Sequence, residues 1–126
     1  MKIEHAAIWV QDIEKIRNFY LKYFRVSSSE MYHNEKTGFY SYFLSFPDGG
    51  ARLEVMHQDE ALEKPKKQYG YAHIALSLGS KDAVNQMTNR LQADGYKRTN
   101  GPRTTGDGYY ESVFEDPEGN TLELTV

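Results

Sequence analysis

The chain carries the same sequence pattern twice, and this repeat limits its possible folds more than any other feature. The segment FPDGGARLEVM (46–56) ends in Leu-Glu and aliphatic residues, and the last eleven residues, DPEGNTLELTV (116–126), follow the same order. In the same way IEHAAIWV (3–10) matches YAHIALSL (71–78), with His5 aligned on His73. Such self-similarity indicates a duplicated structural unit. We therefore predict a tandem duplication.

Each half reads as a strand, a helix and then three strands. Asp12 can cap a helix in which Ile13, Ile16, Tyr20 and Phe24 recur at helical spacing. Ser80 can cap a second helix, SKDAVNQMTNRLQAD, which Gly95 would end. The predicted strands that follow the helices are VSSSEMYH, FYSYFLSF and ARLEVMH in the first half and YKRT, YYESVFE and TLELTV in the second.

These elements predict an α+β fold built from two tandem βαβββ modules, which form a cupped mixed sheet around a central site. Module one spans about residues 1–57, a charged linker about 58–68, and module two about 69–126. A chain of 126 residues corresponds to one domain.

The composition excludes several classes of protein. The net charge of −3 gives no reason to expect a nucleic-acid partner, and no apolar run is long enough to span a membrane. The chain has no cysteine, which rules out disulfides and thiolate metal ligands. Because no signal sequence is recognisable, we expect a cytoplasmic location.

Two histidines and two glutamates occupy equivalent positions in the halves. His5 lies 49 residues before Glu54, and His73 lies 50 residues before Glu123. Side chains alternate between the two faces of a strand, so all four should point away from the helices. A lone strand Glu or His is usually a surface or packing residue. Four of them on one face, however, predict a cation that compensates the carboxylates.

Two imidazoles and two carboxylates suit Ni²⁺, Co²⁺, Zn²⁺, Mn²⁺ or Fe²⁺. With coordination positions left for water or substrate, such a site is typical of catalysis. We predict one divalent ion, held by His5, Glu54, His73 and Glu123. A chelated substrate with adjacent oxygens could lose a proton next to its carbonyl to a neighbouring Glu.

The paired modules and the order His5, Glu54, His73, Glu123 resemble the vicinal oxygen chelate superfamily, most closely its glyoxalase I (lactoylglutathione lyase) type. The resemblance covers the whole chain and implies a metal-dependent lyase or isomerase. It also implies that Glu123 is the proton-shuttling base, with Glu54 as its symmetry-related partner. Sites in this family commonly form between two subunits, so the resemblance implies a homodimer.

Two further residues are candidates for the substrate pocket. Trp9 shares the face of His5 and stands where bacterial glyoxalase I carries an arginine that helps to hold glutathione. Arg103, in the segment RTTGDG, could contact an anionic group, although a hairpin turn is the simpler interpretation of that segment. The substrate class implied is a small molecule such as a thiol adduct of a 2-oxoaldehyde, with the thiol left open.

Other members of the superfamily provide the alternatives. Methylmalonyl-CoA epimerases typically have Gln where Glu54 stands, and the fosfomycin-inactivating thiol transferases usually have His there. Bleomycin-sequestering proteins share the fold but lack the ligands. The alternative functions are therefore a metal-binding protein with epimerase or other chemistry, and a non-catalytic binding or resistance protein.

Overall fold

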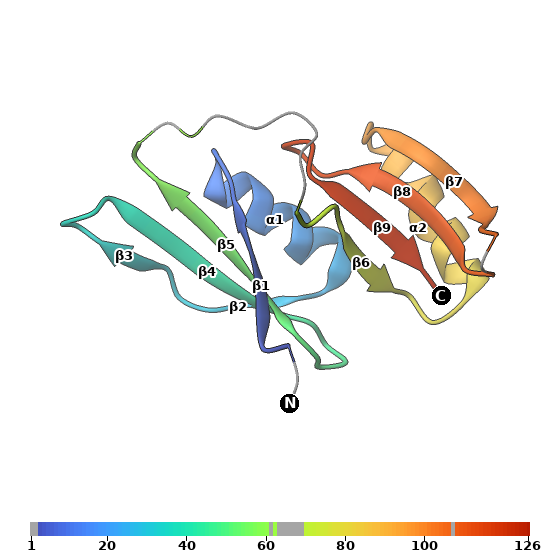
Figure 1. The fold of residues 1–126 in the computed structure, drawn as a ribbon, viewed down its shortest axis with the longest axis horizontal. Coiled ribbons are helices and arrows are strands. Elements are labelled where there is room, and N and C mark those ends of the chain that lie inside the picture. Colours follow the sequence, from blue (N-terminus) through green and yellow to red (C-terminus); the bar gives the residue numbers. More distant parts are fainter. Residues whose placement is uncertain (1–2, 61, 63–69, 107) are drawn as a thin grey trace. The chain divides into compact units, whose positions relative to one another are not determined.

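The computed structural model describes residues 3–60, 62, 70–106 and 108–126. The chain divides into two compact units, Met1–Lys66 and Lys67–Val126. Within the described residues each unit contains one sheet and one helix, which can be followed in Figure 1. The predicted linker lies largely outside the described residues. Within the described ranges no helix is long and apolar enough to cross a membrane.

The first unit is a five-stranded mixed sheet covered by one helix. The elements in chain order are β1 (His5–Trp9), α1 (Ile13–Phe24), β2 (Ser27–Ser28), β3 (Tyr32–Asn34), β4 (Phe39–Ser45) and β5 (Arg52–Gln58). The strand order is β1-β5-β4-β2, with β3 also paired to β4. Only β1 and β5 run parallel. The first and last strands of the unit thus lie side by side.

Helix α1 begins where the sequence predicts. The Asp12 carboxylate accepts a hydrogen bond from the Lys15 backbone N–H at 2.9 Å, which satisfies one of the free donors of the first turn. The apolar stripe of the helix, which includes Ile16 and Tyr20, is buried against β4 and β5. On the sheet, Leu53 and Val55 are buried in the same core, so Glu54 lies on the other face.

The first unit differs from the prediction in one element, because VSSSEMYH forms two short strands instead of one. The Ser29 N–H donates to the Phe43 carbonyl at 2.9 Å, but the Phe43 N–H donates to the Ser29 hydroxyl at 3.0 Å. The side chain of Ser29 thereby replaces a backbone acceptor, and the regular ladder is interrupted between β2 and β3.

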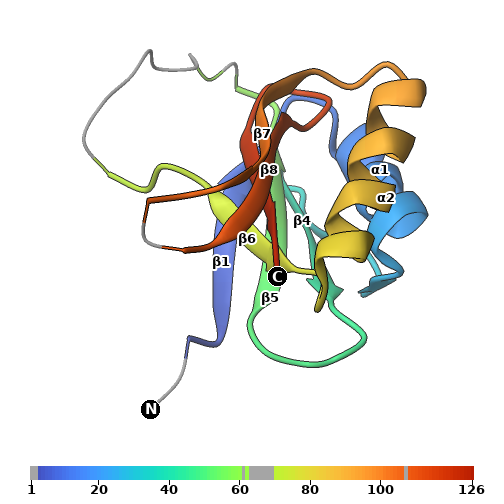
Figure 2. The ribbon, with the colours of Figure 1, turned by 90° about the vertical axis from the view of Figure 1, so that its right-hand side faces the viewer.

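The second unit repeats the arrangement with a four-stranded sheet. Its elements are β6 (Ile74–Ser77), α2 (Lys81–Ala93), β7 (Arg98–Thr104), β8 (Tyr110–Glu115) and β9 (Thr121–Thr125), in the sheet order β6-β9-β8-β7. Strands β6 and β9 are parallel, and the other pairs are antiparallel. Helix α2 packs on one face of this sheet (Figure 2).

Both predicted ends of α2 are confirmed. The Ser80 hydroxyl accepts from the Ala83 N–H at 3.2 Å. At the other end Gly95 has φ +86°, and the Tyr96 and Gly95 N–H groups donate to the carbonyls of Leu91 and Gln92. This pattern is a Schellman motif, which requires a left-handed residue that glycine supplies without strain.

Two turns of the second unit lie close to the candidate site. Between β7 and β8 the Thr105 N–H donates to the Tyr109 carbonyl at 2.7 Å, so the chain reverses direction here as predicted for a hairpin; Asp107 of the RTTGDG segment lies outside the described residues. Between β8 and β9 the buried Asp116 carboxylate accepts from the N–H groups of Glu118 and Asn120, both at 2.9 Å. It also accepts from the Asn120 side-chain amide at 2.8 Å. Asp116 thus fixes the turn that leads into the strand of Glu123.

Candidate metal centre

In the first unit the parallel pairing of β1 with β5 brings His5 and Glu54 together. The register pairs His5 with Arg52 and Ala7 with Glu54, so both side chains lie on the face opposite the helix. His5 Nε2 lies 3.7 Å from Glu54 Oε2. The His5 side chain is 40% exposed and that of Glu54 16%, which leaves the imidazole open to a ligand.

Three residues surround His5 in this unit. Its Nδ1 lies 2.5 Å from Glu4 Oε2, and its ring meets the edge of Phe43 at a centroid distance of 5.4 Å. Arg52 donates from Nε to Glu4 Oε1 at 2.8 Å and lies over the Phe43 ring at 4.1 Å. The imidazole is therefore held on two sides, by a carboxylate and by an aromatic ring.

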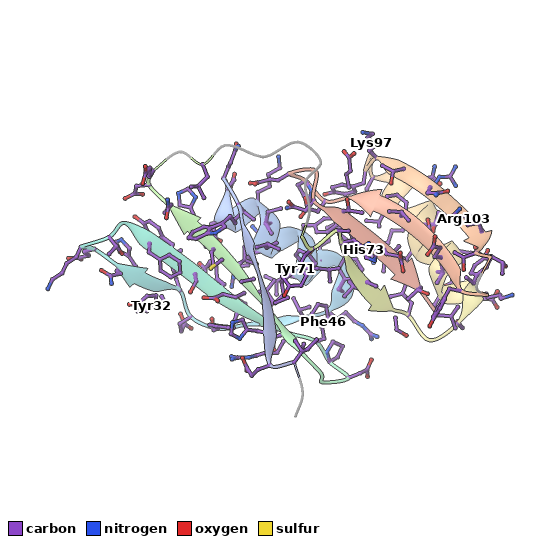
Figure 3. The ribbon with its side chains drawn as sticks, viewed as in Figure 1. Tyr32, Phe46, Tyr71, His73, Lys97 and Arg103 are labelled. Atoms are coloured by element: carbon purple, nitrogen blue, oxygen red, sulfur yellow. The ribbon has the colours of Figure 1, made fainter. Side chains whose placement is uncertain are left out.

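In the second unit the pairing of β6 with β9 produces the equivalent pair. Ala75 is paired with Glu123, and His73 lies just before β6 (Figure 3). His73 Nε2 lies 3.5 Å from Glu123 Oε2, with the His73 side chain 43% exposed and that of Glu123 18%. Each unit therefore holds one His–Glu pair, on the sheet face that strand alternation predicts.

Glu123 has a second carboxyl as a neighbour. Glu111 on β8 is 7% exposed, and strand pairing places it diagonally across from Glu123 on the same face. Burial raises the pKa of Glu123 above its ordinary value of 4.5, the charge of Glu111 and a hydrogen bond with it raise that pKa further, and His73 and Arg103 oppose the shift. The result is a carboxylate with increased proton affinity.

The two candidate pocket residues have different surroundings. Arg103 donates to Glu111 Oε1 from Nε at 3.2 Å and from Nη2 at 2.9 Å, while its side chain stays half exposed. Trp9 is also half exposed, and its ring meets the edge of Phe39. Arg103 thus belongs to the same cluster as Glu111 and Glu123, and Trp9 lies on the same strand as His5.

The other two histidines, His33 and His57, contact other parts of the first unit. His33 stacks on Tyr40 with ring centroids 4.1 Å apart and planes inclined by 7°. His57 Nδ1 lies 3.0 Å from the Val10 carbonyl oxygen.

Two residues of the centre were missed by the sequence analysis, Glu4 and Glu111. For Glu111 a signal existed, because strand alternation puts it on the Val113 face of β8 and Val113 pairs with Glu123. For Glu4 the sequence contained no such signal. Consecutive side chains of a regular strand point to opposite faces, and the Glu4–His5 contact forms because Glu4 precedes β1.

The geometry of each pair is compatible with two ligands of one transition-metal ion. Ligand atoms about 2.1 Å from a metal lie roughly 3.0 to 3.4 Å apart at octahedral or tetrahedral angles. The separations of 3.7 and 3.5 Å are only slightly wider than this. Among the residues that the structure describes, no group of three or more His, Asp or Glu is placed to hold a metal.

Comparison with known proteins identifies the family. The model of the Glyoxalase/Bleomycin resistance protein/Dioxygenase superfamily matches residues 2–124, and the chain belongs to this superfamily. The resemblance to vicinal oxygen chelate proteins and the predicted α+β fold of two related modules are thereby confirmed.

Individual relatives agree with this assignment. The chain is 28% identical over 130 residues to the uncharacterized protein YqjT of Bacillus subtilis, covering 98% of each. The fold is similar to that of a mutant of glyoxalase I from Zea mays, with a TM-score of 0.79, 20% identity, and coverage of 98% of this chain and 44% of that one. It is also similar to a mutant of the fosfomycin resistance protein FosX from Listeria monocytogenes, complexed with Mn(II) and dihydroxypropylphosphonic acid. Here the TM-score is 0.73 and the identity 21%, with 98% of this chain and 90% of that one covered.

Proposed function

We propose that the protein is a metal-dependent lyase or isomerase of the glyoxalase I type, which moves a proton next to a chelated carbonyl or enediolate. The observation that carries the proposal is the repeated His–Glu pair, with Nε2–Oε2 separations of 3.7 and 3.5 Å at equivalent positions of the two units. The similarity to FosX, whose structure contains Mn(II), supports a divalent ion as the cofactor.

In this proposal one ion is held by one His5–Glu54 pair together with one His73–Glu123 pair. Ni²⁺, Co²⁺, Zn²⁺, Mn²⁺ and Fe²⁺ all match a ligand set of two imidazoles and two carboxylates. Such an ion supplies Lewis acidity, which polarises a substrate carbonyl and acidifies the neighbouring C–H group. The reaction would take place in the cytoplasm.

The surroundings of the two glutamates favour Glu123 over Glu54 as the base. Both carboxylates are similarly buried, but only Glu123 has a carboxyl at the diagonal position on the neighbouring strand, where the first unit has Ser41. Because burial and then the charge of Glu111 raise the pKa of Glu123, Glu123 binds a proton more strongly than an ordinary carboxylate. A pKa closer to the working pH makes a better general base.

The substrate contacts follow from the same surfaces. Arg103, held by Glu111, would contact an anionic group of the substrate, and Trp9 would provide an apolar wall on the strand that carries His5. A thiol adduct of a 2-oxoaldehyde such as methylglyoxal has both the adjacent oxygens and the apolar or charged extension that these contacts require.

Two measurements on the purified protein test the function. Elemental analysis should find a divalent metal, and turnover should appear when methylglyoxal is supplied with glutathione or another low-molecular-weight thiol. Metal without turnover on any such adduct would favour the alternative of a metal-binding protein with epimerase or other chemistry. A protein that takes up none of the five metals would contradict the proposal.

We further propose a homodimer, and mixed oligomers of two variants test whether the site is shared. If each site combines pairs from two chains, mixing His5→Ala with His73→Ala protein recreates one site with all four ligands in every mixed dimer. Metal binding and activity should then recover on mixing and refolding. If both pairs of a site come from one chain, every site lacks one histidine and no recovery follows. Light scattering provides the subunit number.

A further inference from the structure

The residues that form the contact between Glu4 and His5 are not repeated in the second unit. At the position equivalent to Glu4 stands Ala72, and at the position equivalent to Arg52 stands Thr121. Neither can reproduce the carboxylate of Glu4 or the guanidinium that holds it. The repeat therefore contains two metal-competent histidines that differ in the residue before them: Glu4 contacts Nδ1 of His5, whereas Ala72 precedes His73.

The arrangement around Glu4 constrains its carboxylate on both oxygens. Oε2 lies 2.5 Å from His5 Nδ1, and Oε1 accepts from Arg52 at 2.8 Å (Nε) and 2.5 Å (Nη2). The Arg52 backbone N–H also donates to the Glu4 carbonyl at 2.9 Å, which fixes the two residues relative to each other. Although its side chain is largely exposed, Glu4 is therefore held in one position against His5.

A carboxylate can only accept at this contact, so the hydrogen must be on the imidazole. In neutral histidine one ring nitrogen carries the hydrogen and the other has a free lone pair. A hydrogen at Nδ1, donated to Glu4, leaves the lone pair on Nε2. Nε2 is the atom that faces Glu54 at 3.7 Å. Metal-ligating histidines usually donate their second ring N–H in this way, which fixes the ring and raises its basicity.

We infer that Glu4 is a positioning residue, which holds His5 in the Nδ1-protonated tautomer and presents the Nε2 lone pair to a metal beside Glu54. The inference rests on the proposed function for the identity of that ligand, but not for the tautomer. Ala72 stands before His73 and cannot fix its ring in this way, so the tautomers of the two histidines of one site would be fixed to different degrees.

The tautomer can be read without any metal. In the metal-free full-length protein at about pH 9, where imidazole side chains are ordinarily neutral, long-range ¹H–¹⁵N correlation spectra distinguish the two ring nitrogens. We expect His5 to be protonated at Nδ1 in the wild type. In Glu4→Ala it should become a mixture of tautomers, while His73 stays unchanged in the same spectrum. Glu35→Gln, at an exposed turn between β3 and β4, is the matched control and should alter neither histidine.

The second readout is a titration with Co²⁺ alone. Loss of a partner of this kind costs about 10- to 100-fold in metal affinity, so Glu4→Ala should bind Co²⁺ that much more weakly than wild type and Glu35→Gln. Glu4→Gln keeps an oxygen that can accept from Nδ1, and it should recover part of both the tautomer and the affinity.

The outcomes separate the inference from the proposed function. If wild-type His5 is protonated at Nε2, or if Glu4→Ala changes neither tautomer nor affinity, the inference is wrong while metal binding can stand. If the wild type takes up no Co²⁺ but its His5 tautomer depends on Glu4, the positioning role holds and the proposed metal function fails.

Discussion

The carboxyl of Glu111 lies buried beside that of Glu123, where the first unit has the neutral Ser41. Burial raises the pKa of Glu123, and the charge of Glu111 raises it further. Two carboxyls at adjacent positions of one sheet face repel each other when both are ionised. Arg103 compensates only part of this, because both of its contacts go to a single oxygen of Glu111. Ionisation of Glu123 therefore destabilises the folded second unit. A carboxyl with such a perturbed pKa is typical of a functional site.

This relationship predicts how stability depends on pH in metal-free protein. Because its pKa is raised in the folded state, Glu123 binds its proton more tightly there than in the unfolded chain. The protonated carboxyl stabilises the fold fully at pH values below the ordinary pKa of 4.5. This stabilisation is lost as the pH rises through the higher pKa that Glu123 has in the folded protein. Glu123→Gln, which cannot ionise, should therefore melt at a higher temperature than wild type at about pH 8 and at nearly the same temperature at about pH 4.

Thermal denaturation in EDTA, followed by circular dichroism, measures the difference. Glu35→Gln is the control for loss of one exposed charge and should track the wild type at both pH values. A Glu123→Gln variant that is less stable than wild type at high pH would show that ionised Glu123 imposes no cost on the fold.

Much of this centre could be predicted because the repeat fixes it. The pattern Leu-Glu-aliphatic puts Glu54 and Glu123 opposite buried residues, and parallel pairing of the first and last strands of each unit brings a histidine beside each. The capping residues Asp12 and Ser80 were likewise readable, since each supplies an oxygen just before an apolar helical stripe. These features follow from local periodicity, which sequence shows directly.

What the sequence did not show depends on contacts outside that periodicity. The break between β2 and β3 arises because the Ser29 hydroxyl replaces a backbone acceptor. A serine in a strand can also leave the backbone hydrogen bonds intact, so its presence in the sequence does not predict the break. Glu4 reaches His5 because it lies before the strand and is held by Arg52, 48 residues away. Neither contact has a spacing rule that a single sequence would reveal.

A second prediction concerns the turn before β9. Asp116→Ala removes an acceptor from two backbone N–H groups and one side-chain amide in a part-buried turn. Unsatisfied donors of this kind cost about 1–3 kcal/mol, so the free energy of unfolding in urea should fall by about 2 kcal/mol. Asp48→Ala in the equivalent turn of the first unit is the control, because Asp48 is exposed, and it should change stability by less than about 0.5 kcal/mol. Equal losses in the two variants would contradict the role assigned to Asp116.

A third prediction assigns the metal to the histidine pair. His73→Ala should lose most of its metal affinity while keeping the wild-type circular dichroism spectrum, since His73 is half exposed and its removal leaves the core intact. His33→Ala removes a histidine that stacks on Tyr40 instead, and its metal content should equal that of wild type. Full metal occupancy in His73→Ala, measured by elemental analysis after dialysis, would refute the ligand assignment.

The last prediction separates binding from catalysis at Glu123. In Glu123→Gln the amide oxygen can still act as a ligand, but the amide cannot accept a proton near neutral pH. A general base contributes about 10²- to 10⁴-fold in rate, so kcat on a methylglyoxal–thiol adduct should fall by that order while metal content falls far less. Glu54→Gln keeps the same chemistry at the symmetry-related position without a Glu111 neighbour, and its kcat should fall less than that of Glu123→Gln. Exchange of the carbon-bound substrate proton with solvent deuterium, followed by NMR, reports the proton transfer itself. Wild-type exchange in Glu123→Gln combined with lost exchange in Glu54→Gln would reverse the assignment and make Glu54 the base.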